Sequence, residues 1–113
     1  MDREELLETL DELQHDLGKH LLMPVALLPQ TASHVDLRDA VSRGLRQVAA
    51  WRAFGQGPGR SLAGDQAFAV VDARVAAAAQ WGMAVHLDRS RVQADFAAVG
   101  EAICAWRRQV IGD

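Results

Sequence analysis

Apolar residues recur at the spacing of an α-helix in four separate segments of this chain. The first segment shows the pattern most simply, because its leucines return every three or four residues, at Leu6, Leu10, Leu13, Leu17 and Leu21. This spacing places the leucine side chains on one face of a helix, and that face must be buried against another element. We therefore expect a protein made mostly of helix, with little or no sheet.

The first two helices have clear expected ends. The first runs from about residue 2 to residue 23, and we expect Pro24 to end or kink it before a connector over residues 25–32. The second opens at Ser33, a good N-cap residue, with Asp36 three residues later. The glycine-rich stretch over residues 55–59 should stop this helix and serve as a linker.

The last two helices are also bounded by local signals. The third starts near Asp65 as N-cap and runs to Trp81, with Gly82 just past its end. We expect residues 83–87 to form a connector. The fourth opens with a capping box over residues 90–93 and continues as a strict heptad of apolar residues to Val110.

Four amphipathic helices with short connectors predict one all-α domain covering residues 1–113. We expect a four-helix bundle, or helical hairpins that complete a bundle by dimerisation. Trp51, Trp81 and Trp106 all lie on the apolar stripes, so we expect them to be core anchors. The heptad of the last helix is typical of a long packing seam inside a bundle or a homodimer.

Composition limits the class of protein. Half of the residues are apolar and 24% are charged, which is typical of a globular chain and not of a disordered one. The single cysteine, Cys104, excludes an internal disulfide, and we expect it to be a buried, inert thiol. The longest apolar run, residues 21–28, is about half of what a membrane span needs, and no signal peptide is visible. We expect a soluble cytoplasmic protein.

The charge is unevenly distributed along the chain. The first 16 residues carry seven acidic groups and one basic group, whereas the remainder has a net charge of +3. Neither part has the basic stripe that nucleic-acid binding requires, so we expect no nucleic-acid partner. The acidic start is either a solvated helix face favoured by the helix dipole or a docking surface for a basic partner.

One short motif carries candidate chemistry: His15-Asp16-Leu17-Gly18-Lys19. On a helical wheel His15 lies about 180° from the leucine stripe, so we expect it to be exposed. Lys19 lies one helical turn further on the same side, and His20 falls at the edge of the packing stripe. Gly18 costs about 1 kcal/mol in a helix relative to Ala, so something other than helix stability favours a small residue there.

These five residues resemble the central His-Asp pair of HD-domain metal phosphohydrolases, which is often followed by Ile or Leu, Gly and Lys. The resemblance implies that His15 and Asp16 bind a divalent metal that activates water for attack on a phosphoester. It also implies a His on a preceding helix and a distant Asp. Asp72 is a candidate for the latter, but no His precedes His15.

The same motif resembles the phosphoacceptor helix of histidine kinases and histidine phosphotransfer proteins, where an exposed His is often followed by an acidic residue. The resemblance implies that His15 accepts a phosphoryl group from a partner's phosphoaspartate, with Asp16 orienting or deprotonating the imidazole. Gly18 would leave room for a partner loop, and Lys19 would stabilise the phosphoryl oxygens. Gly18 and Lys19 stand in the reverse of the order usual in phosphotransfer domains.

A third interpretation treats the His-Asp pair as contact residues and not as catalysts. We predict a non-catalytic helical signalling or regulatory module, without a cofactor, that binds another signalling protein. The expected contact residues are Asp11, Glu12, His15, Gly18 and Lys19, with His15 and Asp16 as the reactive pair in a phosphotransfer version. The alternative is a reduced HD-type phosphohydrolase with His15, Asp16 and Asp72 as metal ligands.

Overall fold

The computed structural model describes residues 3–58 and 65–111, and within these ranges the chain forms helices and turns with no strand. The first helical segment has three parts: α1 (Arg3–Leu17), a π-helical turn η1 (Gly18–Leu22) and α2 (Met23–Ala26). The second segment is α3 (His34–Gln56). The third joins α4 (Asp65–Ala79) to a 3₁₀ turn η3 (Gln80–Gly82), and the fourth is α5 (Arg89–Ile111). The expectation of an all-helical chain with four helical segments is confirmed.

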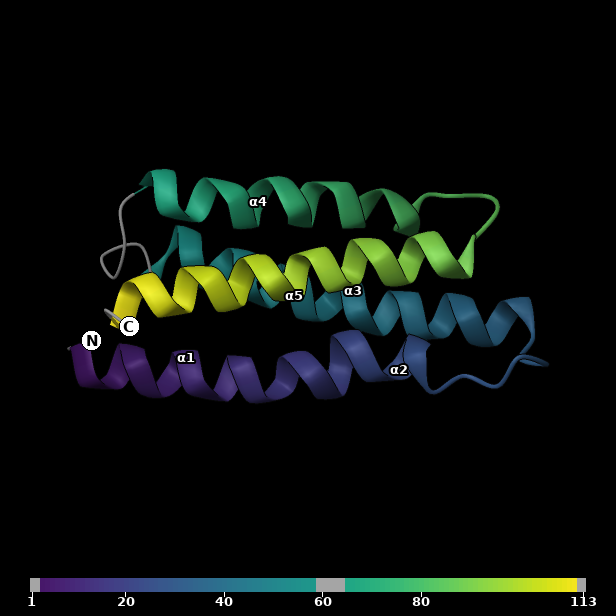
Figure 1. The fold of residues 1–113 in the computed structure, drawn as a ribbon, viewed down its shortest axis with the longest axis horizontal. Helices are drawn as coiled ribbons and strands as arrows, with labels where there is room; N and C mark the ends of the chain where they lie inside the picture. The colour runs from purple at the N-terminus through teal and green to yellow at the C-terminus, as the bar shows by residue number, and fades with distance from the viewer. Residues whose placement is uncertain (1–2, 59–64, 112–113) are drawn as a thin grey trace.

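The four segments run side by side along the long axis of a molecule that measures 46 × 22 × 22 Å (Figure 1). α4 packs mainly against α5, while α3 contacts α4, η1 and α2. The Arg3 guanidinium donates a hydrogen bond to the Val110 carbonyl oxygen at 3.1 Å, so the start of α1 meets the end of α5. This arrangement is compatible with a four-helix bundle. In the described ranges, no helix combines the length and the apolar character needed to cross a membrane.

The first helix does not end at Pro24, where the sequence predicted an end or a kink. A proline ring inside an α-helix clashes with the carbonyl four residues earlier, here that of His20, and proline has no N–H to donate. The π turn η1 widens the helix just before the proline, and the Met23 N–H donates to the Gly18 carbonyl, five residues back. Helix therefore continues to Ala26, and Val25, expected to open the connector, is buried in the core.

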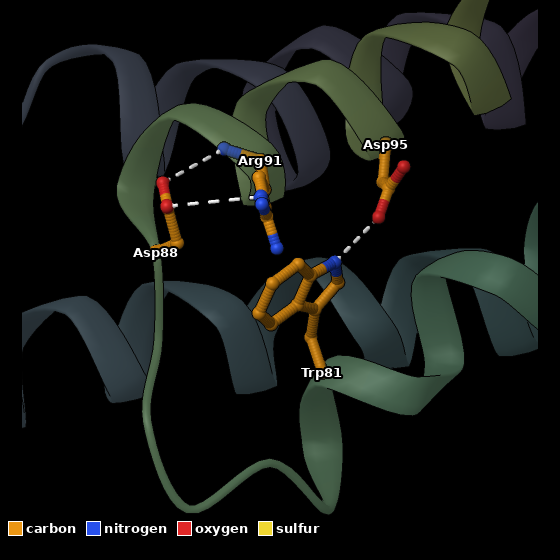
Figure 2. Close-up of polar contacts among 4 residues, drawn as sticks. All are labelled: Trp81, Asp88, Arg91 and Asp95. Carbon is orange, nitrogen blue, oxygen red and sulfur yellow. Dashed lines mark hydrogen bonds and ion pairs between the residues drawn. The ribbon is translucent and has the colours of Figure 1, made fainter.

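Helix capping follows expectation for α3 but not for α5. Ser33 and Asp36 form a reciprocal capping box, with the Asp36 N–H donating to Ser33 Oγ at 3.1 Å. α5 starts at Arg89, one residue before the expected cap Ser90, and the Arg91 N–H donates to Asp88 Oδ1 at 3.2 Å (Figure 2). The expected capping box over residues 90–93 is therefore wrong, because the carboxylate of Asp88 caps the helix instead.

The glycine-rich stretch after α3 begins its linker later than expected. Helix α3 passes through Gly55 to Gln56. Gly55 is buried because the Phe68 ring of α4 lies directly over it, and a Cβ atom at this position would be 2.0 Å from Phe68 Cζ. Close packing of α3 on α4 therefore requires the glycine. Gly59, also assigned to this linker, lies outside the described residues.

The bounds of the third segment agree with expectation to within a residue or two. Asp65 is the first residue of α4, where it was expected as the N-cap. Gly82 closes η3, and residues 83–87 form a connector as expected. The Arg38 guanidinium of α3 donates to the Ala84 carbonyl at 2.8 Å and thereby ties this connector to the body of the molecule.

The core centres on an aromatic cluster contributed by three helices. Trp51 is fully buried, Trp106 is 2% exposed, and their ring centroids lie 6.2 Å apart in an edge-to-face arrangement. Phe54 and Phe68 pack edge-on against Trp106. Trp81, expected in the core as well, is only partly buried, and its Nε1 donates to the Asp95 carboxylate at 2.6 Å (Figure 2).

Candidate functional site

The outer side of α1 carries the residues that the sequence singled out. α1 buries its leucines toward the core, so the opposite side of the helix points to solvent. His15 lies in the last turn of α1 and is exposed, as expected. It lines a shallow surface depression with Asp11, Glu12 and Asp16. We call these four residues, together with Gly18 and Lys19, the α1 outer face.

Gly18 and Lys19 continue this face into the π turn. Lys19 is exposed, four residues beyond His15. Apart from its chain neighbours and the backbone of its own helix, no described residue has an atom within 4 Å of a Cβ built on Gly18. Packing within the described part of the chain therefore does not require a glycine at this position, in contrast to Gly55. The surface directly above Gly18 is open.

Some charged groups of the α1 outer face already form ion pairs within the protein, and others do not. Asp11 forms an ion pair with Arg107 of α5, with an Nη2–Oδ1 distance of 2.6 Å. Glu12, Asp16 and Lys19 have no hydrogen-bond or ion-pair partner among the described residues, and neither has His15. The face therefore offers two free carboxylates, an accessible imidazole and one ammonium group. An imidazole in this setting can donate or accept hydrogen bonds, or attack an electrophile supplied from outside.

The third residue of the HD-type ligand set lies elsewhere. Asp72 is on α4, where Arg52 Nε of α3 lies 2.9 Å from its Oδ1. The structure therefore brings His15 and Asp16 together, as neighbours on α1, but does not bring Asp72 to them. Within the described ranges, no three His, Cys, Asp or Glu side chains gather into a group that could hold a metal ion.

His20 has a role that the sequence did not reveal. It is partly buried at the edge of the core, as its position on the helical wheel indicated. Its Nδ1 accepts a hydrogen bond from Arg43 Nε of α3 at 3.0 Å. This contact anchors the π turn to α3, and it thereby holds Gly18 and Lys19 in place. The pairing could not be found from sequence, because 23 residues separate the two side chains.

Sequence reasoning also missed a groove between α5 and the first helical segment. Two adjoining cavities of about 350 and 300 Å³ share Leu22 and Ala97 as lining residues. Cys104 lines the larger one and is partly buried, not fully buried as expected. Its Sγ accepts a hydrogen bond from Gln14 Nε2 at 3.2 Å.

Neither the residues of the α1 outer face nor those of the groove can be interpreted through a relative. No protein-family model, curated protein or solved structure matches this chain.

Proposed function

We propose that this protein is a small helical regulatory module, without a cofactor, that acts in the cytoplasm and binds another signalling protein. In this proposal the four helical segments form a four-helix bundle that serves as a rigid scaffold. The α1 outer face is the docking surface, with Asp11, Glu12, His15, Gly18 and Lys19 as contact residues.

The observation that carries the proposal is the glycine at position 18. A glycine inside a helix costs about 1 kcal/mol relative to Ala. At Gly55 the close approach of Phe68 explains the glycine, whereas at Gly18 no described atom beyond the backbone of its own helix and its chain neighbours lies within 4 Å of the Cβ position. A contact from outside the chain accounts for a small residue there. Gly18 also opens the π turn, and π turns inserted into α-helices frequently accompany functional sites.

Lys19 supplies the charge that a test can exploit. It is exposed and, among the described residues, has no ion-pair partner, so its ammonium group is available to an acidic group on the partner. Reversing a charge at the rim of an interface acts chiefly on the association rate, and the effect weakens as salt screens the interaction.

The test compares Lys19→Glu with Arg74→Glu. Arg74 is an exposed residue on α4, and α4 lies on the opposite side of the molecule from α1 (Figure 1). Both variants replace a cation with a carboxylate, so they change the net charge equally. The partner is first isolated by affinity capture with the wild-type protein, and dissociation constants are then measured at two salt concentrations. We expect Lys19→Glu to weaken binding about tenfold at low salt and less at high salt, with Arg74→Glu unchanged. Equal affinities for both variants would contradict the proposal.

A phosphotransfer version of the proposal assigns chemistry to His15. The exposed imidazole would attack the phosphorus of a partner's acyl phosphate, so that a P–N bond forms and the carboxylate leaves. Lys19, one turn away, would balance the charge of the phosphoryl oxygens. The support for this version is the exposure of His15 beside Asp16 and an unpaired Lys19.

Phosphoramidate tests this version without a partner, because it transfers a phosphoryl group to imidazole and releases ammonia. His86, exposed in the connector before α5, is the internal control. Peptide mass spectrometry measures how fast phosphate accumulates on each histidine. We expect it to accumulate faster on His15 than on His86, and we expect this difference to shrink in Lys19→Glu. Equal rates at the two histidines would remove the phosphotransfer version and leave the docking proposal standing.

A further inference from the structure

The middle of the side of α5 that faces away from the core consists mostly of small residues. Its buried side carries the apolar heptad, including Phe96, Ile103 and Trp106. The middle of the opposite side, which we call the α5 outer face, consists of Ala94, Ala97, Ala98, Glu101, Cys104, Ala105 and Arg108, and the exposed side chains of Arg91, Gln93 and Gln109 flank it. Only Glu101 and Arg108 are long, and both are exposed. Another helix can therefore approach this face closely.

The groove described above runs along one edge of the α5 outer face. Ala97 lines both of its cavities, and Glu101, Cys104 and Arg108 line the larger one. Leu22 lines the opposite side of the groove and is 37% exposed. Beside it, Met23 is 49% exposed. An exposed apolar groove with charged residues at its rim is typical of protein interfaces.

Glu101 and Arg108 are the two charged residues on this face, and neither has a partner among the residues that the structure describes. They lie seven residues apart on one helix, about 10.5 Å along its axis, which is too far for a salt bridge with each other. Neither forms an ion pair or hydrogen bond within the described part of the chain. The neighbouring charges on α5 are engaged, since Arg107 pairs with Asp11 and Asp95 accepts from Trp81.

This charge pattern is self-complementary. We infer that the α5 outer face is an interface between two copies of this chain, which pair with their α5 helices antiparallel. When the two-fold axis passes between Cys104 and Ala105, Glu101 of each copy lies opposite Arg108 of the other. The same patch then serves both copies and forms two equivalent salt bridges, as a closed two-fold dimer requires. The alanines allow the helices to approach closely, and the exposed Leu22 of each copy flanks the contact.

This pairing leaves His15 on the α1 outer face accessible. Gln14 points toward α5, because its amide donates to Cys104 Sγ. His15 follows Gln14 by one residue and therefore lies about 100° around α1, away from the dimer contact. The dimerisation test below uses no partner protein, so its failure is distinguishable from a failure of the function proposed for the α1 outer face.

Charge reversal provides the test. The variants are Glu101→Arg, Arg108→Glu and the double variant that carries both changes, with Arg74→Glu on α4 as a control. Sedimentation equilibrium at low salt measures the dimer dissociation constant, and circular dichroism verifies the helical fold. We expect each single reversal to weaken dimerisation at least about tenfold, because it places like charges opposite each other twice. The double variant should return to within about threefold of wild type, since it restores both pairs with inverted signs.

Cys104 gives a second readout on the same variants. It is the single cysteine of the chain and lies next to the proposed axis, so a short bismaleimide should join two wild-type copies. We expect the cross-linked fraction to fall in both single variants and to recover in the double variant. A chain that stays monomeric at every concentration, or a dimer indifferent to the reversals, would overturn the inference. In the first case the groove would belong to a different protein's helix.

Discussion

At the scale of single residues, the same residue type serves two purposes in this protein. Trp51 and Trp106 fill the core, whereas Trp81 lies at its edge with its indole N–H on Asp95. All three lie on apolar stripes, and the spacing correctly predicted burial for two of them. The spacing could not show that α5 would bring a carboxylate to the third, because that contact depends on how α5 packs beside η3.

Replacing Trp106 with Ala tests the core assignment. Trp106 is 2% exposed and touches Trp51, Phe54 and Phe68, so the substitution should leave a large cavity. We expect the free energy of unfolding, measured by urea titration, to fall by about 3–5 kcal/mol. The corresponding Trp81→Ala change should cost clearly less, because that side chain is already partly solvated. Equal losses at the two positions would contradict the packing described.

At the scale of the helices, the apolar periodicity and the capping residues predict where each helix lies. Tertiary contacts, however, determine where several of the helices end. Pro24 is a strong helix-breaking signal, yet helix continues past it because η1 widens the turn and buried Val25 holds α2 against the core. The local pattern correctly predicts Ser33 as a cap, because the capping hydrogen bonds involve only residues close to it in sequence. Asp88 was overlooked as the cap of α5, since Ser90 offered a similar pattern two residues later.

The cap of α5 can be checked with a matched pair of alanine variants. Asp88→Ala removes the carboxylate that accepts the Arg91 N–H, and we expect a loss of about 1 kcal/mol in the free energy of unfolding. Ser90→Ala changes an exposed residue inside the first turn and should stay within about 0.5 kcal/mol of wild type. A larger loss at Ser90 than at Asp88 would reinstate the capping box expected from sequence.

Two helical glycines should respond oppositely to the same substitution. Gly55→Ala forces a Cβ into the Phe68 ring, so we expect about 1–3 kcal/mol of destabilisation. Gly100→Ala places its Cβ at an ordinary contact distance of 3.6 Å from Leu22, so the gain in helix propensity should stabilise the protein by about 1 kcal/mol. Thermal unfolding of both variants measures these changes in stability. A stabilised Gly55→Ala variant would show that the α3–α4 contact is misplaced.

At the scale of the whole molecule, the sequence predicted the all-helical class and the exposure of His15, because both follow from the period of a single helix. The separation of Asp72 from His15 could not be predicted, since it depends on which helices become neighbours. The groove beside α5 escaped prediction for the same reason. It exists because Leu22, Ala97 and Gly100 leave space between two helices that are distant in sequence.

The central claim is that partner binding, and not folding, requires a glycine at position 18. The most direct measurement compares wild type, Gly18→Ala and Gly18→Leu for both unfolding free energy and affinity for the captured partner. The space above Gly18 is open, so we expect the Gly18→Leu substitution to leave the fold intact or to stabilise it by about 0.5–1 kcal/mol. Binding should be weakened moderately in Gly18→Ala and abolished in Gly18→Leu. Undiminished binding by Gly18→Leu, in a protein at least as stable as wild type, would contradict the claim and place the docking surface elsewhere.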